Sequence, residues 1–220
     1  MLLYYITDRT QFPGDESARH RALLEKIEEA ACAGVHCIQL REKDLCAREL
    51  ESLAREAVAR LKKLRTANRK LKTIFLINSR ADVALAAEAH GVHLRSDDIS
   101  PSDLRQVWLS YRGGDPGRDP LPMMAVSCRT VSDIVRAKSE GADFAVFAPV
   151  FEKKDAPEVK PRGLEALREA CTSAAKFPVL ALGGVTVGNA ASCITAGAAG
   201  IAGIRLFQEN RIEEVVRALR

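Results

Sequence analysis

The feature that most constrains this chain of 220 residues is an alternation of short apolar runs with longer amphipathic stretches. Apolar runs of strand length separated by helical patterns are typical of successive strand–helix units around a parallel sheet. The candidate strands are residues 2–6, 35–40, 73–77, 92–94, 123–126, 144–147, 179–182 and 200–204. Between or after them, apolar residues recur with helical spacing at residues 23–33, 50–64, 81–89, 131–139, 164–174 and 212–219.

The number of units favours a closed barrel over an open sheet. Eight units leave about 27 residues for each, near the lower limit for an eight-stranded barrel. We therefore expect an α/β protein with one (β/α)8, or TIM, barrel domain over residues 1–220. An open doubly wound sheet is the alternative, but the GxGxxG motif typical of dinucleotide-binding sheets does not follow the first run. Predicted helix caps agree with the barrel units, with Ser100 and Thr130 at amino ends and Gly34, Gly91, Gly141 and Gly197 at carboxyl ends.

Composition restricts the class of partner. Hydrophobic residues make up 47% of the chain and charged residues 28%, as in an ordinary globular protein. Because the net charge of +4 is spread along the chain, nucleic acid is not expected as a partner, whereas small phosphorylated molecules are. Apolar runs of membrane-spanning length and zinc-type cysteine spacing are both absent from the sequence. We expect a soluble, cytoplasmic protein with reduced thiols and no membrane partner.

Polar residues after the second candidate strand point to an anion-binding site. Gln39, Arg41 and Lys43 occupy alternate positions, and alternate residues of an extended segment face the same way. One amide and two cations converging at the carboxyl end of a barrel would bind an anion such as a pyrophosphate. The alternative is that they are solvated charges at a strand end.

Other strand ends carry further candidates. Asp97 or Asp98 could hold Mg²⁺, although an Asp pair there is also typical of a helix start. Gly183 and Gly184 could form a phosphate-binding turn beside Arg205, or serve the turn alone. Two loops rich in turn formers are also expected: residues 112–120 on the amino-terminal side of the barrel, and residues 152–163 as a candidate lid at the carboxyl-terminal face.

Histidines and cysteines contribute less to the predicted chemistry. His20, His36, His90 and His93 lack a carboxylate or cysteine at triad-like spacing, so we interpret them as structural. Cys32, Cys37, Cys171 and Cys193 fall in apolar patterns and should behave as small core residues. Cys128, beside Ser127 at a strand end, is the cysteine to probe for reactivity.

The strand-end segments resemble those of the thiamine phosphate synthase and TenI family. The resemblance rests on YITD at 5–8, IQLREKD at 38–44, INSRADVA at 77–84, GVHL at 91–94, GADFAVFAPVF at 141–151 and ALGGV at 181–185, in that order. It implies a TIM barrel, a homodimer, and the joining of a pyrimidine diphosphate to a thiazole phosphate with release of pyrophosphate. By resemblance, Gln39, Arg41, Lys43 and Asn78 hold the pyrimidine diphosphate, Ser127 contacts pyrophosphate, Asp98 binds Mg²⁺ and Gly184 belongs to the thiazole phosphate loop.

Three positions depart from the family pattern. Ser79 stands where the synthase usually has a metal-binding Asp, and Arg95 stands in the turn after His93, near the expected diphosphate. The loop after the sixth strand reads EKKD at 152–155, so Lys153, Lys154 and Lys160 all remain candidates for the lysine of that loop.

Two further functions stay open. The TenI-like alternative is a thiazole tautomerase, whose general base is a histidine in a turn that reads APVF at 148–151 here. Because Pro149 has no proton to transfer, the synthase is favoured. The other alternative is a non-catalytic barrel that binds a phosphorylated ligand, since fold alone does not decide function.

Overall fold

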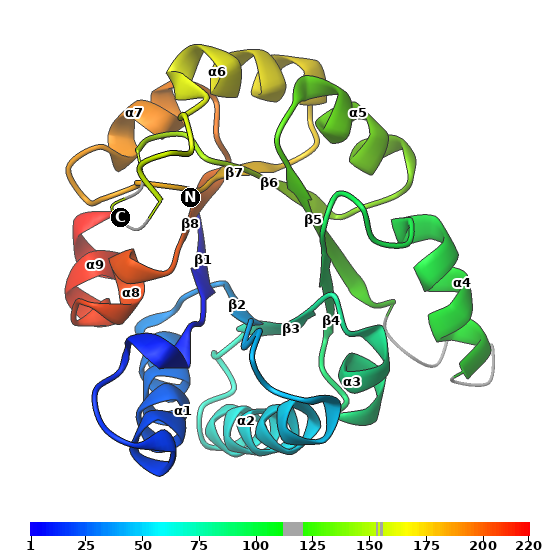
Figure 1. Cartoon of the computed structure of the whole chain (residues 1–220), viewed down its shortest axis with the longest axis vertical. Helices are drawn as coiled ribbons and strands as arrows, with labels where there is room; N and C mark the ends of the chain where they lie inside the picture. Colours follow the sequence, from blue (N-terminus) through cyan, green and yellow to red (C-terminus); the bar gives the residue numbers. More distant parts are fainter. Residues whose placement is uncertain (112–120, 153, 155) are drawn as a thin grey trace.

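The computed structural model describes residues 1–111, 121–152, 154 and 156–220, and its eight strands close into one parallel barrel (Figure 1). Each strand pairs with the next along the chain, and Tyr4 aligned with Ala202 joins the last strand to the first. The predicted TIM barrel is therefore confirmed. The strands are β1 (Leu2–Ile6), β2 (Cys37–Leu40), β3 (Ile74–Asn78), β4 (Gly91–Leu94), β5 (Met123–Cys128), β6 (Phe144–Phe147), β7 (Val179–Ala181) and β8 (Gly200–Gly203). The loop expected at 112–120 lies outside the described residues.

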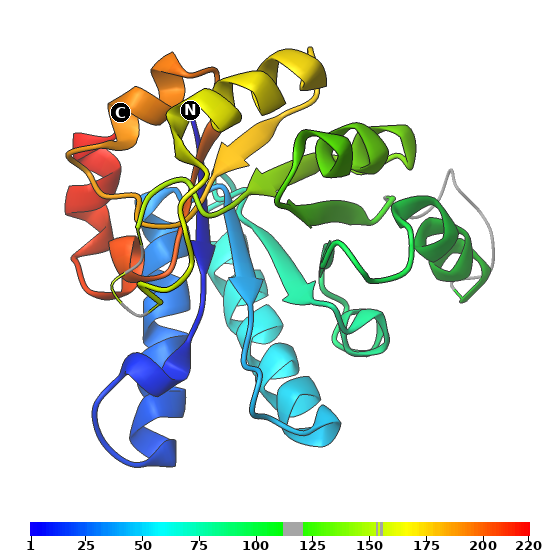
Figure 2. The same ribbon diagram turned by 45° about the horizontal axis from the view of Figure 1, so that its top comes forward.

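Helices surround the strands on the outside, as Figures 1 and 2 show from two directions. They are the 3-10 turn η1 (Arg9–Gln11) and the helices α1 (Glu16–Ala33), α2 (Ala47–Ala67), α3 (Ala81–Ala86), α4 (Pro101–Tyr111), α5 (Val131–Ser139), α6 (Gly163–Ala174), α7 (Ala190–Thr195), α8 (Arg205–Gln208) and α9 (Ile212–Ala218). The helical ranges drawn from periodicity left out α4, α7 and α8. The start of α4 was indicated by the predicted cap at Ser100, whereas α7 and α8 are too short to show an amphipathic repeat. None of the helices in the described part of the chain has the length and apolar character needed to cross a membrane.

Local capping explains several helix boundaries. The Asp15 side chain accepts a hydrogen bond from the Ala18 amide (2.8 Å), so α1 begins earlier than its apolar pattern predicts. Thr130 caps α5 as predicted, and Gly34 ends α1 in the left-handed conformation (φ 85°). The prediction for Gly91 is wrong, because this residue begins β4. A Cβ there would lie 1.9 Å from the Met123 carbonyl oxygen, so close strand packing requires the glycine.

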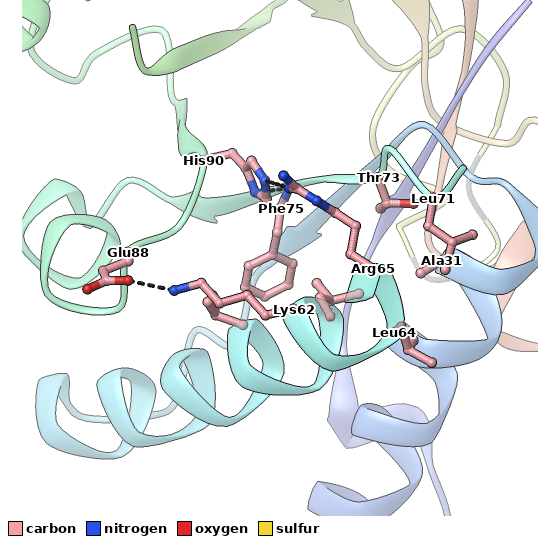
Figure 3. Close-up of a pocket in the computed structure, with 11 residues that line it drawn as sticks. Ala31, Lys62, Leu64, Arg65, Leu71, Thr73, Phe75, Glu88 and His90 are labelled. Atoms are coloured by element: carbon pink, nitrogen blue, oxygen red, sulfur yellow. Dashed lines mark hydrogen bonds and ion pairs between the residues drawn. The ribbon is translucent and has the colours of Figure 1, made fainter. Parts of the chain in front are cut away.

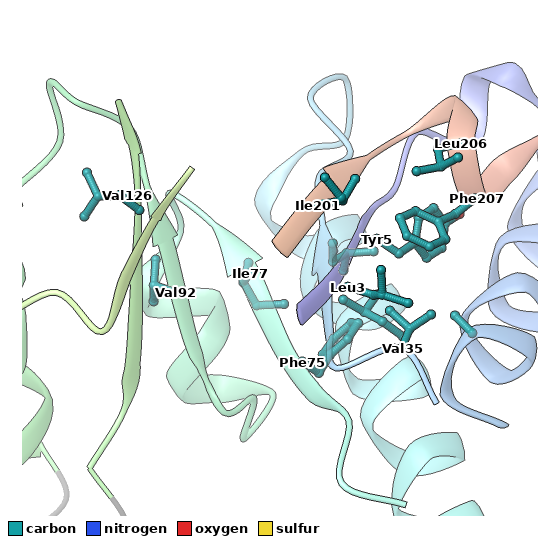
Figure 4. Close-up of a cluster of buried hydrophobic side chains, with 14 of the residues drawn as sticks. Leu3, Tyr5, Val35, Phe75, Ile77, Val92, Val126, Ile201, Leu206 and Phe207 are labelled. Carbon is teal, nitrogen blue, oxygen red and sulfur yellow. The ribbon is translucent and has the colours of Figure 1, made fainter. Parts of the chain in front are cut away.

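Two buried layers follow from the alternation of side chains along the strands. The larger layer fills the space between strands and helices; Figure 4 shows part of it, where Leu3 and Tyr5 of β1 lie near Phe207 of α8. The smaller layer fills the barrel interior and consists of Tyr4, Ile6, Cys37, Leu76, Ala125, Phe144, Val146, Leu180 and Ala202. On β2, β3 and β5 the next inward positions toward the carboxyl ends are polar, namely Gln39, Asn78 and Ser127, whereas Leu182 and Ile204 after β7 and β8 remain apolar. The barrel therefore changes from an apolar plug to a polar mouth within one layer.

Candidate active site at the carboxyl ends of the strands

Gln39 is the deepest polar group that β2 contributes to the barrel mouth. It follows Cys37 of the inner layer by two positions, and only 1% of its surface is exposed. Its side-chain Nε2 is the one buried side-chain nitrogen or oxygen among the described residues that has no hydrogen-bond partner. Leaving a buried donor unpaired costs about 1–3 kcal/mol. A ligand that supplies an acceptor would remove this cost, so the Gln39 amide marks a binding position.

Arg41 and Lys43 differ in their surroundings. β2 ends at Leu40, and Arg41 follows it, partly buried and near enough to His93 to act on that ring electrostatically. Burial lowers the pKa of Arg41, against the nearby Asp8 and Glu42, yet an arginine keeps its charge. Lys43 lies in a turn and is exposed, so strand alternation does not extend to it. Of the predicted trio, Gln39 lies in β2, Arg41 directly follows the strand and Lys43 lies in the following turn.

A buried carboxylate holds the segment that carries these cations. Thr7 Oγ1 donates to Glu42 Oε1 (2.5 Å) and accepts a hydrogen bond from the Arg41 amide (3.0 Å). The Arg9 amide donates to Glu42 Oε2 (2.9 Å), and the Arg9 guanidinium reaches the same oxygen (3.3 Å). Burial raises the pKa of Glu42, although these hydrogen bonds from Thr7 and Arg9 oppose the shift. The end of β1 is therefore tied to the backbone beside Arg41.

Arg9 extends this cluster to the turn that contains Lys43. Its guanidinium forms a bidentate pair with Asp44 (2.7 and 2.9 Å) and contacts Glu16 at the start of α1 (2.6 Å). The hydrogen bonds that Arg9 donates to Asp44 are the main cause that raises the pKa of Arg9. We call Thr7, Arg9, Glu16, Glu42 and Asp44 the Arg9 network. It anchors residues 41–44 from outside the ligand-binding mouth.

A second set of polar groups crosses the barrel interior. Tyr4 Oη lies 2.9 Å from His93 Nδ1, and His93 Nε2 lies 2.7 Å from Ser127 Oγ. The Tyr4 and His93 rings also stack, with centroids 5.7 Å apart. His93 is 2% exposed, and burial, followed by the charge of Arg41, lowers its pKa to about 3. Sequence spacing gave no sign of this contact between His93 and the predicted site residue Ser127.

Asp98, the predicted metal ligand, is held by neighbours from two loops. It accepts hydrogen bonds from the Arg95 amide (2.8 Å) and from Arg95 Nε and Nη2 (3.1 and 2.9 Å). Burial acts to raise the pKa of Asp98, but hydrogen bonds from Arg95 and Ser79 outweigh it and the pKa is lowered. Asp98 therefore stays ionised. Asp97 is exposed and lies 3.6 Å from Arg95.

The donor set around Asp98 fits Mg²⁺ only as a one-carboxylate site. No group of three His, Cys, Asp or Glu side chains in the described residues could hold a metal ion by itself. Magnesium commonly binds through one or two carboxylates and completes its shell with substrate phosphates and water. The Arg95 side chain is 60% exposed, so its ion pair with Asp98 contributes little and can be displaced.

Gly183 and Gly184 form a turn at the end of β7 that other residue types would strain. Both have positive φ (95° and 64°), and a Cβ on Gly184 would lie 2.3 Å from the Glu152 carbonyl oxygen. Hydrogen bonds from Phe151 and Asn189 take up the two carbonyls. Among the described residues, none takes up the two amide N–H groups. The turn thus serves chain packing and leaves donors for an anion.

The remaining predicted residues lie on the same rim. Asn78 ends β3 and contacts Ser79 (3.4 Å). Arg205 follows β8 at the start of α8, with Glu209 at 3.5 Å. Lys154 and Lys160 are exposed in the segment after β6, whereas Lys153 lies outside the described residues. Cys128 is buried, and burial raises the pKa of its thiol to about 12, so the sequence-based suggestion that it could be reactive is not supported.

A partly open cavity of about 70 Å³ lies at the opposite end of the barrel, beside α2 and the starts of β3 and β4 (Figure 3). Its polar lining is internally paired: Lys62 contacts Glu88 (2.5 Å), and Arg65 lies 3.4 Å from His90. Burial lowers the pKa of His90, and its Nδ1 accepts the Phe75 amide (3.1 Å). The barrel mouth remains the site of the predicted chemistry.

Comparison with known proteins agrees with this geometry. Residues 3–207 match the family model described as thiamine monophosphate synthase. A thiamine-phosphate synthase of Roseiflexus is 36% identical over 91% of this chain and 75% of its own, and one of Methanoculleus marisnigri is 34% identical over 99% and 93%. The solved thiamine phosphate pyrophosphorylase of Pyrococcus furiosus superposes with a TM-score of 0.76 at 27% identity, covering 100% of this chain and 93% of that one. This chain belongs to the thiamine monophosphate synthase family.

Proposed function

We propose that this chain is a thiamine-phosphate synthase. It would join 4-amino-2-methyl-5-hydroxymethylpyrimidine diphosphate to a thiazole phosphate, giving thiamine phosphate and pyrophosphate. Relatives that are 36% and 34% identical to it over the aligned residues carry this activity in their names. The observation that carries the proposal is the buried, unpartnered Gln39 amide beside the charged Arg41 at the barrel mouth. Both groups donate hydrogen bonds, so the mouth suits a ligand rich in acceptors and negative charge.

The reaction asks the protein to stabilise a leaving group. The bond between the pyrimidine methylene carbon and the diphosphate oxygen breaks, and the electron pair leaves with the diphosphate. The thiazole nitrogen then gives its lone pair to the carbon. No side chain needs to act as a nucleophile, so fixed donors that neutralise developing charge supply the rate enhancement.

Each rim residue receives a role in this scheme. Arg41, Lys43 and Ser127 act on the departing diphosphate. Gln39 and Asn78 orient the pyrimidine substrate. Phosphate oxygens are held on two sides of the rim. Arg95 holds those of the pyrimidine diphosphate, and Arg205 with the amides of Gly183 and Gly184 holds those of the thiazole phosphate. The Arg9 network keeps Arg41 and the turn with Lys43 in place while charge develops.

Magnesium is the proposed cofactor, held by Asp98 and by phosphate oxygens of the substrate. When bound, Mg²⁺ neutralises charge on the leaving diphosphate. Because Ser79 is not a carboxylate, we expect the ion to bind weakly until the diphosphate is present. Arg95 would then turn from Asp98 toward the phosphates.

The test is to incubate the purified protein with both substrates and MgCl₂ and to measure thiamine phosphate by chromatography. We expect product with the unmodified chain and almost none with Arg41→Ala. Arg60→Ala is the matched control, because Arg60 pairs with Glu28 and Glu56 between α1 and α2, away from the mouth. Absence of product from the unmodified chain would contradict the proposal.

The same assay separates the two alternatives. A TenI-like tautomerase would isomerise a carboxylated thiazole phosphate without metal, but Pro149 occupies the place of its base. A non-catalytic barrel would bind pyrophosphate and turn over neither substrate. We further propose that the chain works in the cytoplasm as a homodimer on small phosphorylated substrates, with no nucleic acid or membrane partner. Its six cysteines are free thiols, which suits that compartment.

A further inference from the structure

Ser127 carries one hydroxyl proton, and its direction decides what the residue offers a ligand. The only hydrogen-bond partner of Ser127 Oγ among the described residues is His93 Nε2, at 2.7 Å. If Ser127 donates to His93, it presents only lone pairs to the mouth. If it accepts from His93, its own proton is free to point at an anion. The histidine tautomer therefore decides whether Ser127 attracts or repels a diphosphate.

The charges of the two inner groups are settled by their burial. Tyr4 is fully buried, which raises the pKa of its phenol well above 10, so the hydroxyl keeps its proton. Burial and the nearby Arg41 lower the pKa of His93 to about 3, so its ring is neutral at physiological pH. Asp98 acts in the other direction as the smallest of the three causes, and within the described residues the ring's hydrogen bonds go to Tyr4 and Ser127 rather than to a carboxylate. A neutral imidazole carries one N–H, on either Nδ1 or Nε2.

The two tautomers differ in which group they leave without an acceptor. With the proton on Nε2, the Tyr4 hydroxyl donates to Nδ1 and the Nε2–H donates to Ser127, so both buried donors have acceptors and the unpaired proton is that of the partly exposed Ser127. With the proton on Nδ1, the ring donates to Tyr4 Oη, and the phenol proton loses its acceptor. His93 Nδ1 is the only partner of the Tyr4 hydroxyl in the described part of the chain. An unpaired buried donor is unfavourable by about 1–3 kcal/mol.

We propose that Tyr4 and His93 are positioning residues that fix the Ser127 hydroxyl as a hydrogen-bond donor to the departing diphosphate. This inference rests on the proposed function, because it assigns a polarity to one contact of that reaction. Tyr4 acts through His93, and His93 acts through Ser127; neither needs to touch the ligand. This series of hydrogen bonds links β1, β4 and β5, which only the closed barrel brings together. The fold itself therefore sets the direction in which the Ser127 hydroxyl proton points.

Two consecutive neutral donors, Tyr4 and His93, orient the Ser127 hydroxyl better than a charged histidine would. An imidazolium would donate at both nitrogens and compete with Tyr4 for the role of donor. A neutral ring accepts at one nitrogen and donates at the other. Because Tyr4 donates to Nδ1, the ring donates to Ser127 from Nε2. Consecutive hydrogen bonds of this kind also polarise one another, which strengthens the final donor.

The first test is spectroscopic and needs no catalysis. Long-range ¹H–¹⁵N correlation spectra of the histidine-labelled protein identify the nitrogen of His93 that carries the proton. We expect the Nε2–H tautomer, assigned by comparison with His93→Gln. A neutral ring protonated on Nδ1, or an imidazolium at neutral pH, would overturn the inference.

The second test asks whether Tyr4 acts through Ser127. Calorimetric titration with inorganic pyrophosphate in MgCl₂ compares the unmodified chain, Tyr4→Phe, Ser127→Ala and the double variant. Ser127→Ala should weaken binding by roughly 10-fold or more, as expected for a hydrogen bond to a charged group. Tyr4→Phe should weaken it by roughly 2- to 10-fold, and it should have no further effect in the Ser127→Ala background.

Tyr5→Phe is the matched control, because it removes the hydroxyl of the neighbouring buried tyrosine. Tyr5 faces the outer layer, where its hydroxyl donates to Gln208 (3.2 Å), so pyrophosphate binding should not change. Equal losses from Tyr4→Phe and Tyr5→Phe, or an effect of Tyr4→Phe that persists without the Ser127 hydroxyl, would show a merely structural role. An unmodified chain that does not bind pyrophosphate would also overturn the inference. Failure of synthesis with these binding results intact would count only against the proposed function.

Discussion

Arg9→Leu tests whether the Arg9 network stabilises the fold and the site together. The Arg9 and Glu42 side chains are 4% and 1% exposed, so the substitution leaves a carboxylate buried without its cation. Removing one partner of a buried ion pair typically costs about 3–5 kcal/mol. Arg9 also pairs with Asp44 and Glu16, but those carboxylates are more than half exposed and add little. We expect the free energy of unfolding to fall by about 3–5 kcal/mol.

The stability lost in Arg9→Leu should become smaller as the pH falls. The pKa of Glu42 is already raised by burial in the native state, and loss of Arg9 raises it further. An acid with a raised pKa in the folded state destabilises the fold when ionised and does so less as pH falls through that pKa. The difference between Arg9→Leu and the unmodified chain should therefore shrink between about pH 8 and about pH 5.

Urea unfolding at both pH values measures this difference, with Arg60→Leu as the control for an exposed ion-pair network. The control should lose no more than about 1 kcal/mol. Adding Glu42→Leu to Arg9→Leu should restore part of the loss, because the unpaired charge is then gone. A deficit no larger than that of the control, or one that acid leaves unchanged, would refute the reasoning.

Three further predictions concern the mouth of the barrel. Gln39→Leu should leave the melting temperature unchanged or higher, because it removes an unpaired donor, while lowering kcat/KM by roughly 10-fold; a fall in stability without a kinetic effect would contradict this. Gly184→Ala should lower the melting temperature far more than Gly141→Ala, since both have positive φ but only Gly184 would meet a neighbouring carbonyl. Asp98→Asn should raise the MgCl₂ concentration needed for half-maximal rate, and an unchanged requirement would exclude Asp98 as the metal ligand.

Much of this architecture could be predicted from the sequence, because strands and helices leave local patterns of apolar residues. Apolar runs of period two and helical stretches of period 3.6 gave the eight strands and the barrel. The same alternation predicted that Gln39 and Arg41 face the same way. It did not place Lys43, because the hydrogen bonds of the Arg9 network end the extended segment in a turn. The prediction for Gly91 was wrong for a related reason. A glycine is required there by the close approach of the neighbouring strand β5, which no local sequence pattern reveals.

The sequence analysis did not identify the hydrogen-bonded series of polar side chains inside the barrel. Tyr4, His93 and Ser127 come from β1, β4 and β5, and only closure of the sheet brings them together. Their shared inward register was a usable signal, since Tyr4 aligns with Ala202 of the interior layer and His93 aligns with Ala125. A histidine at an inward position near a carboxyl end is a better candidate for a site residue than its sequence neighbours suggest.

The position of His93 also explains why the apolar plug contains a polar chain. A barrel interior of this size is filled by side chains, and replacing His93 and Tyr4 by apolar residues would avoid desolvating three polar groups. Their retention costs stability unless the donors of both buried residues find acceptors, which only the Nε2–H tautomer achieves. That arrangement leaves a single donor unused, the proton of Ser127, at the level where Gln39 also has unused donors. Two independent elements of the barrel thus end with unsatisfied donors at the same mouth, and an anionic ligand is what satisfies both.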